Sequence, residues 1–161
     1  RPGDVNAYAA SAFYAVDRFR SYKSDWEKLY KEGYIIVADR YTTSNGVHQC
    51  SKLPKEQWND FMDWLYDFEY RKMGIPAPDG VIYLNMSPEV SQKLLSVRYA
   101  GDESKKDIHE KDTEYLKKSQ SAARFCSEHD KWNVINCDDG EKPFTIEEIH
   151  EKIIKKVTEI I

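Results

Sequence analysis

The segment YIIVADRYTTS, residues 34–44, gives the clearest indication of the fold of this chain. It begins as an uninterrupted apolar run, residues 34–38, and changes abruptly to an acid, a base and several hydroxyls. A short apolar run without polar alternation predicts a strand covered on both faces, as in a parallel sheet flanked by helices. Ligands of such sheets bind beyond the carboxyl ends of the strands. The pattern places Asp39 and Arg40 at such an end, although a pair that merely caps a loop explains these two residues equally well.

Helical and strand patterns alternate on either side of this segment. Before it, apolar residues recur at helical spacing over residues 5–19, and we expect them to form one broad buried stripe. Residues 42–53 are polar and predict a loop. Further strands are predicted at residues 81–84 and 133–137, with helices between and after them. The alternation is typical of an α/β fold with a parallel sheet.

Aromatic and apolar residues also keep helical spacing after Pro54. They are Trp58, Phe61, Met62, Leu65 and Phe68. Residues at this spacing are more often core or a subunit interface than a platform for stacking a ligand.

Length, charge and cysteine content limit the class of protein. The 161 residues suit a single domain, and the net charge of −4 gives no basic field that would recruit DNA or RNA. The apolar runs are too short to cross a membrane. Three scattered cysteines without CxxC spacing indicate reduced thiols, and not a disulfide framework or a zinc site. We therefore expect a cytoplasmic protein whose partners are neither nucleic acids nor membranes.

Four motifs together resemble the bacterial thymidylate kinases. Residues 39–44, DRYTTS, are similar to the family's Asp-Arg-Tyr-x-x-Ser, with Gln49 as its downstream glutamine. Residues 14–18, YAVDR, match its Tyr/Phe-x-x-Asp-Arg, and residues 78–89 match its Pro-Asp, apolar run and Pro-Glu. The charged stretch at about 99–112 lies where the family has its lid. The resemblance implies a P-loop kinase-type parallel sheet flanked by helices on both faces.

This resemblance implies transfer of the γ-phosphoryl group of ATP to thymidine monophosphate, with Mg²⁺. Arg40 would hold the acceptor phosphate, because a guanidinium matches phosphate oxygens with two hydrogen bonds. Asp39 would bind the metal through water, since Mg²⁺ prefers oxygen ligands and keeps several waters. Lys105 and Lys106 would close over the phosphates as the lid, and Arg98 would contact ATP.

The same resemblance assigns a pocket for the base. Tyr14 matches the residue that stacks on thymine, and Arg18 matches the arginine that binds the carbonyl edge of the base. Their one-turn spacing puts them on one side of a helix. Because Arg18 lies beside the apolar stripe, we expect its removal to weaken substrate binding and to change stability little. The remaining pocket residues would be Ser44, Asn45, His48 and Gln49, with His48 replacing the tyrosine or phenylalanine usual in the family.

The phosphate-binding motif GxxxxGK[ST] does not occur in the 161 residues. In the resembled fold, the strand that precedes this motif lies between the strands predicted at residues 34–39 and 81–84. We therefore expect the chain to be incomplete at its N-terminus, to be inactive by itself, and not to fold alone as this sheet. The family also implies a homodimer that pairs through helices.

Two alternatives stay open. One is a kinase of another nucleoside or nucleotide on the same fold, although Tyr14 with Arg18 favours thymine. The other is a catalytically inactive relative that lacks the P-loop and binds nucleotides or serves a structural role.

Overall fold

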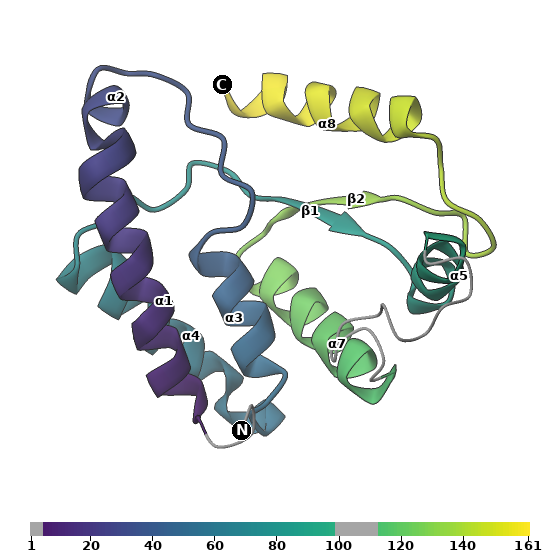
Figure 1. The fold of residues 1–161 in the computed structure, drawn as a ribbon, viewed down its shortest axis with the longest axis horizontal. Helices are drawn as coiled ribbons and strands as arrows, with labels where there is room; N and C mark the ends of the chain where they lie inside the picture. The colour runs from purple at the N-terminus through teal and green to yellow at the C-terminus, as the bar shows by residue number, and fades with distance from the viewer. Residues whose placement is uncertain (1–4, 99–112) are drawn as a thin grey trace. The chain divides into compact units, whose positions relative to one another are not determined.

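A computed structural model describes residues 5–98 and 113–161 (Figure 1). The chain divides into two compact units, Arg1–Ala77 and Pro78–Ile161. The first contains the helices α1 (Ala7–Ser21), α2 (Glu27–Lys31), α3 (Thr42–Cys50) and α4 (Trp58–Tyr66), the π-helical turns η1 (Tyr22–Trp26) and η3 (Asp67–Lys72), and the 3₁₀ turn η2 (Lys55–Gln57). The second contains the strands β1 (Ile82–Asn85) and β2 (Asn133–Asn136) and the helices α5 (Pro88–Arg98), α7 (Thr113–His129) and α8 (Ile146–Ile160).

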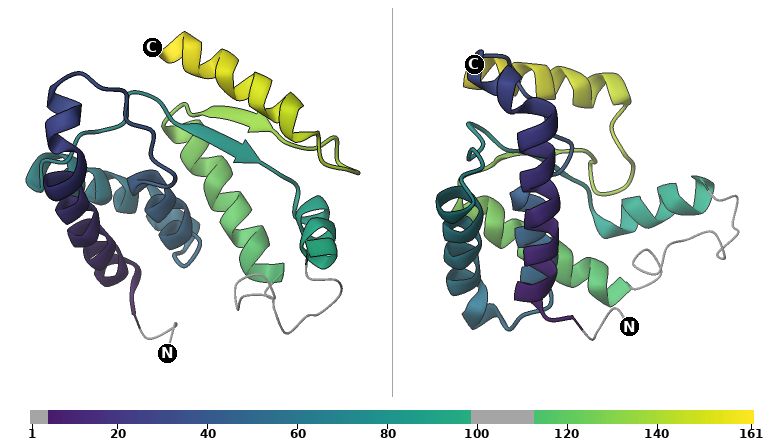
Figure 2. Two further views of the ribbon diagram at one scale, coloured as in Figure 1. Left: turned by 45° about the horizontal axis from the view of Figure 1, so that its top comes forward. Right: turned by 60° about the vertical axis from the view of Figure 1, so that its left-hand side comes forward.

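In the first unit, α3 packs against both α1 and α4 (Figures 1 and 2). The core contains Phe61, Met62 and Leu65 of α4, all fully buried. The approach of α3 to α4 is close at Gly46, where an added Cβ would lie 2.8 Å from the Met62 sulfur. The interpretation of the aromatic helix as core is therefore confirmed for these three residues.

In the second unit, β1 and β2 pair in parallel, with Ile82 opposite Asn133. The predicted strands at residues 81–84 and 133–137 are thus confirmed to within one residue. Helices α7 and α8 lie on opposite faces of this pair (Figures 1 and 2). Helix α8 begins with a capping box, in which the Thr145 hydroxyl accepts from the Glu148 N–H and the Glu148 carboxylate accepts from the Thr145 N–H.

The predicted strand at residues 34–38 is wrong. In the described chain this run has no regular secondary structure and lies outside the sheet, and Val37 is 90% exposed. A strand requires a neighbour to hydrogen-bond with its N–H and C=O groups. The sheet of the described residues consists of β1 and β2, so the apolar run has no ladder partner there. Asp39 and Arg40 consequently lie in a loop before α3 and not at a strand end.

The predicted apolar stripe of α1 is also wrong. The buried face of this helix carries Ala7, Ser11 and Ala15, whereas Phe13 is 76% and Val16 60% exposed. Small side chains allow α3 to approach α1 closely, and the larger apolar residues remain outside this contact.

Residues 42–53, predicted as a loop, form helix α3 as far as Cys50. Its buried face is made of small or polar residues at helical spacing. Because that face has no apolar periodicity, the pattern that reveals amphipathic helices is missing from the sequence.

Candidate functional site

A buried ion pair connects α1 to the turn that follows α4. Arg18 Nε donates to Glu69 Oε2 at 2.6 Å, and Arg18 Nη2 donates to Glu69 Oε1 at 3.2 Å. The Glu69 side chain is fully buried, and that of Arg18 is 16% exposed. Removing one partner of such a pair leaves an uncompensated buried charge, at a cost of about 3–5 kcal/mol. The buried pair therefore predicts a larger contribution of Arg18 to stability than the sequence led us to expect.

Two residues that lead into α3 complete this cluster. The Thr42 hydroxyl donates to Glu69 Oε2 at 2.9 Å, and the Arg18 guanidinium lies 5.4 Å from the centre of the Tyr41 ring. Burial raises the pKa of the Tyr41 hydroxyl, which stays protonated and donates to the Pro76 carbonyl at 2.9 Å. The Glu69 carboxylate thus binds Arg18 of α1 and Thr42 of α3.

Glu69 is a residue that the sequence motifs did not reveal. Its position continues the buried positions Phe61 and Leu65 of α4 by one further helical turn. A charged residue at the next position of an apolar stripe is the signal that could have revealed it, because a buried charge requires a partner.

A second polar contact joins α1 and α3 near Ser11. The Ser11 oxygen lies 2.7 Å from the Ala7 carbonyl and 3.4 Å from Asn45 Oδ1. One turn further along α3, Gln49 is also buried. Among the described residues, Asn45 Nδ2 and Gln49 Oε1 are buried without a hydrogen-bond partner. Each such group costs about 1–3 kcal/mol, and a ligand that supplied an acceptor and a donor would recover that free energy.

The loop before α3 holds Arg40 in an unusual conformation. Arg40 has φ = 66°, in the left-handed region that non-glycine residues rarely adopt. Its Nε donates to the Ser44 hydroxyl at 2.8 Å, which leaves four guanidinium N–H donors for other partners. Both the preceding Asp39 and Arg40 itself are exposed. Strained backbone of this kind is concentrated at functional sites.

The other predicted site residues occupy more varied positions. Tyr14 is 58% exposed, one turn before Arg18 on α1, and His48 is half-buried on α3. Arg98 is the last residue of α5, in the second unit. Lys105 and Lys106, with the rest of the predicted lid, lie outside the described residues.

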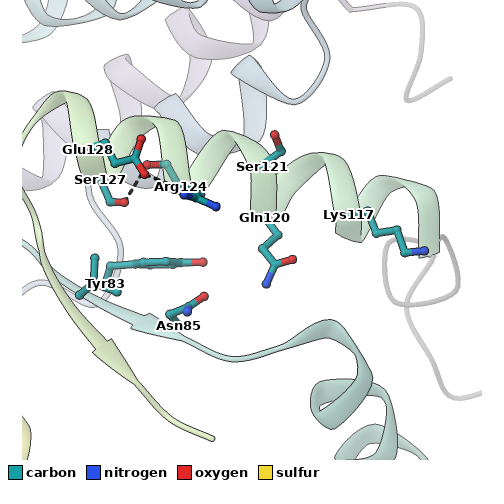
Figure 3. A pocket seen from close by; sticks show the side chains of 9 residues that line it. Tyr83, Asn85, Lys117, Gln120, Ser121, Arg124, Ser127 and Glu128 are labelled. Atoms are coloured by element: carbon teal, nitrogen blue, oxygen red, sulfur yellow. Dashed lines mark hydrogen bonds and ion pairs between the residues drawn. The ribbon is translucent and has the colours of Figure 1, made fainter. Parts of the chain in front are cut away.

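A separate open pocket of about 580 Å³ lies within the second unit, between α7 and the two strands (Figure 3). Tyr83 and Asn85 of β1 face Gln120 and Arg124 of α7 across it. Arg124 is ion-paired with Glu128 at 2.9 Å. None of the described residues that line this pocket is a predicted site residue.

Comparison with known proteins gives consistent matches. The family model described as thymidylate kinase matches residues 1–153. A probable thymidylate kinase of Pyrobaculum aerophilum is 25% identical over 60% of this chain and 45% of its own length. The thymidylate kinase of Mycobacterium tuberculosis is 23% identical over 84% of this chain and 66% of its own length, and that of Plasmodium falciparum is 31% identical over 83% and 54%. The chain thus spans about half to two thirds of the length of these relatives.

Proposed function

This chain belongs to the thymidylate kinase family, and from that membership we propose that the protein phosphorylates thymidine monophosphate with ATP as the donor. Members of this family are phosphotransferases with a P-loop kinase fold, and the parallel β1–β2 pair flanked by helices is consistent with that fold. Phosphoryl transfer depends on positioning and on neutralising charge, so the proposal concerns which residues hold the acceptor nucleotide.

The main support for the proposed substrate site is a pair of buried polar atoms on α3 that have no hydrogen-bond partner in the described chain. Asn45 Nδ2 offers donors and Gln49 Oε1 offers an acceptor, and both are buried in the described chain. Thymine presents two carbonyl oxygens and the N–H between them along one edge. We propose that α3 binds that edge together with Arg18, whose bond pair to Glu69 leaves three N–H donors. Tyr14 would stack on the base from α1, and His48 would lie near the sugar.

The phosphate of the acceptor is proposed to bind Arg40. Its exposure, its left-handed backbone and the contact of Nε with Ser44 support a guanidinium held with its far end toward a ligand. Asp39, the exposed neighbour, is proposed as a water-mediated ligand of Mg²⁺. Lys105 and Lys106 are proposed to close over the phosphates, and Arg98 to contact ATP. Most of the proposed residues act on the acceptor nucleotide, and the 161 residues contain no GxxxxGK[ST] loop to cradle the ATP phosphates.

We further propose a cytoplasmic homodimer with no nucleic-acid partner. The exposed Phe13 and Val16 on the outer side of α1 support a protein interface there. The buried cysteines Cys50, Cys126 and Cys137 fit a reducing compartment. In the described parts of the chain, no helix is both long and apolar enough to cross a membrane. A monomeric mass by light scattering of the full-length protein at micromolar concentration would contradict the dimer.

The test of function is ATP-dependent phosphorylation of a panel of nucleoside monophosphates by the full-length protein. We expect the highest kcat/KM for thymidine monophosphate. A higher value for another monophosphate would support a related kinase, and the absence of turnover with every member would support an inactive relative.

A further inference from the structure

We propose that Glu69 is a positioning residue for substrate recognition, acting through Arg18. The inference rests on the proposed function of this site and adds a residue that the sequence motifs do not contain. Glu69 lies in η3, immediately after α4, and its side chain is fully buried. It is therefore placed to act on neighbouring side chains and not on a ligand directly.

The Arg18–Glu69 pair is a two-point contact. The two bonds from Nε and Nη2, at 2.6 and 3.2 Å, use one edge of the planar guanidinium. A contact of this kind fixes the plane of the group as well as its position. The opposite edge, formed by Nη1 and the second Nη2 hydrogen, is then held in one direction.

Tyr41 restrains the same guanidinium from another side. Its ring centre lies 5.4 Å from the guanidinium carbon, and its hydroxyl is anchored to the Pro76 carbonyl. A cation is attracted to the face of an aromatic ring at this distance. The ring thus limits the movement of Arg18 on a side that Glu69 does not contact.

Glu69 is also connected to the proposed phosphate-binding loop. Glu69 Oε2 accepts from Thr42, the first residue of α3, and Arg40 and Ser44 lie within two residues of Thr42. One carboxylate therefore fixes the arginine proposed to bind the base and the helix start next to the arginine proposed to bind the phosphate.

The experiment compares Glu69→Gln and Glu69→Asp with a matched control in the full-length protein. Asp67→Asn removes a carboxylate from the same turn, where Asp67 pairs with the exposed Arg71 and Lys72. We expect both Glu69 variants to raise KM for thymidine monophosphate at least about tenfold, with KM for ATP and kcat changed less than about threefold. Asp67→Asn should match the wild type.

Glu69→Asp keeps the charge but moves the carboxylate. If Glu69→Gln folds poorly, KM for thymidine monophosphate in Glu69→Asp therefore tests the positioning role. A further variant, Arg18→Met with Glu69→Leu, removes both charges together. We expect it to regain a wild-type melting midpoint while KM for thymidine monophosphate stays high. Recovery of KM in that variant would overturn the proposal.

Wild-type KM in Glu69→Asp, in a protein that phosphorylates thymidine monophosphate normally, would also overturn the positioning role and leave the proposed function intact. Failure of the wild-type protein to phosphorylate this substrate would instead contradict the proposed function.

Discussion

Two regions of the first unit contrast in a way that hydrophobicity alone does not explain. The apolar run at residues 34–38 is largely exposed, whereas a cluster of polar side chains, Arg18, Thr42, Asn45, Gln49 and Glu69, is buried or nearly so. The apolar run lacks a strand partner among the described residues, while Arg18, Thr42 and Glu69 satisfy one another. The burial of Arg18, Thr42 and Glu69 follows the availability of partners, and the buried atoms of Asn45 and Gln49 that lack a partner support the proposed base-binding site.

The largest expected effect comes from breaking the buried pair. Arg18→Ala leaves the buried Glu69 carboxyl group without its guanidinium partner, so we expect the free energy of unfolding to fall by about 3–5 kcal/mol. Urea denaturation of the full-length protein measures this change. A loss below about 1 kcal/mol would mean that the pair is solvated and that the contrast between the two regions is weaker than the structure indicates.

The second prediction concerns the exposed arginine next to the cluster. Arg40→Ala should lower kcat/KM roughly a hundredfold or more, which corresponds to a loss of about 3 kcal/mol of transition-state stabilisation. The melting midpoint should stay almost unchanged, because Arg40 is exposed. Arg71→Ala, at an 81% exposed arginine, is the matched control and should keep wild-type kinetics. Wild-type turnover in Arg40→Ala would remove this residue from the site.

The third prediction tests whether Gln49, whose buried Oε1 has no hydrogen-bond partner in the described chain, contacts the nucleotide. Gln49→Leu removes a buried acceptor without a partner, so the ligand-free protein should be more stable by about 1 kcal/mol while its affinity for thymidine monophosphate falls. Gln57→Leu, at an exposed glutamine, should change neither quantity. Thermal melts with and without the nucleotide separate the two effects. Equal stabilisation of both variants by the nucleotide would show that Gln49 does not contact it.

The secondary structure and core of this chain could be predicted from the sequence only where the interacting segments lie within it. The strands β1 and β2 and the core of α4 were predictable, because their apolar patterns and their partners are in the same unit. The segment at residues 34–38 has the pattern of a strand, but hydrogen-bonded pairing is not a property of the segment itself. Helix α3 was missed because its buried face is polar or small.

The candidate site was predictable only in part. The resemblance predicted Arg18, Asn45 and Gln49 as site residues, but its motifs do not contain Glu69, which lies 51 residues from Arg18 in the chain. That contact depends on the packing of α1 beside the turn after α4, and local spacing carries no information about it.

The smallest expected effect on stability lies in the exposed run. In a protein made from residues 1–161 alone, Val37→Lys should leave the melting midpoint almost unchanged, since Val37 is 90% exposed there, and should reduce the association of that protein. Val97→Lys, at a 79% exposed valine of α5, is the control for the added charge. Light scattering measures the association. If both substitutions reduced association equally, the added charge, and not the loss of an apolar residue from the run at 34–38, would account for the reduction.

The most direct test of the proposed base-binding site is a titration of the full-length protein with thymidine monophosphate, followed by the side-chain amide signals of Asn45 in ¹⁵N-labelled protein. We predict that the Asn45 Nδ2 protons, buried without a partner in the described chain, shift strongly and become protected from exchange as the nucleotide saturates. Saturable binding of the nucleotide with the Asn45 signals unmoved would contradict this site.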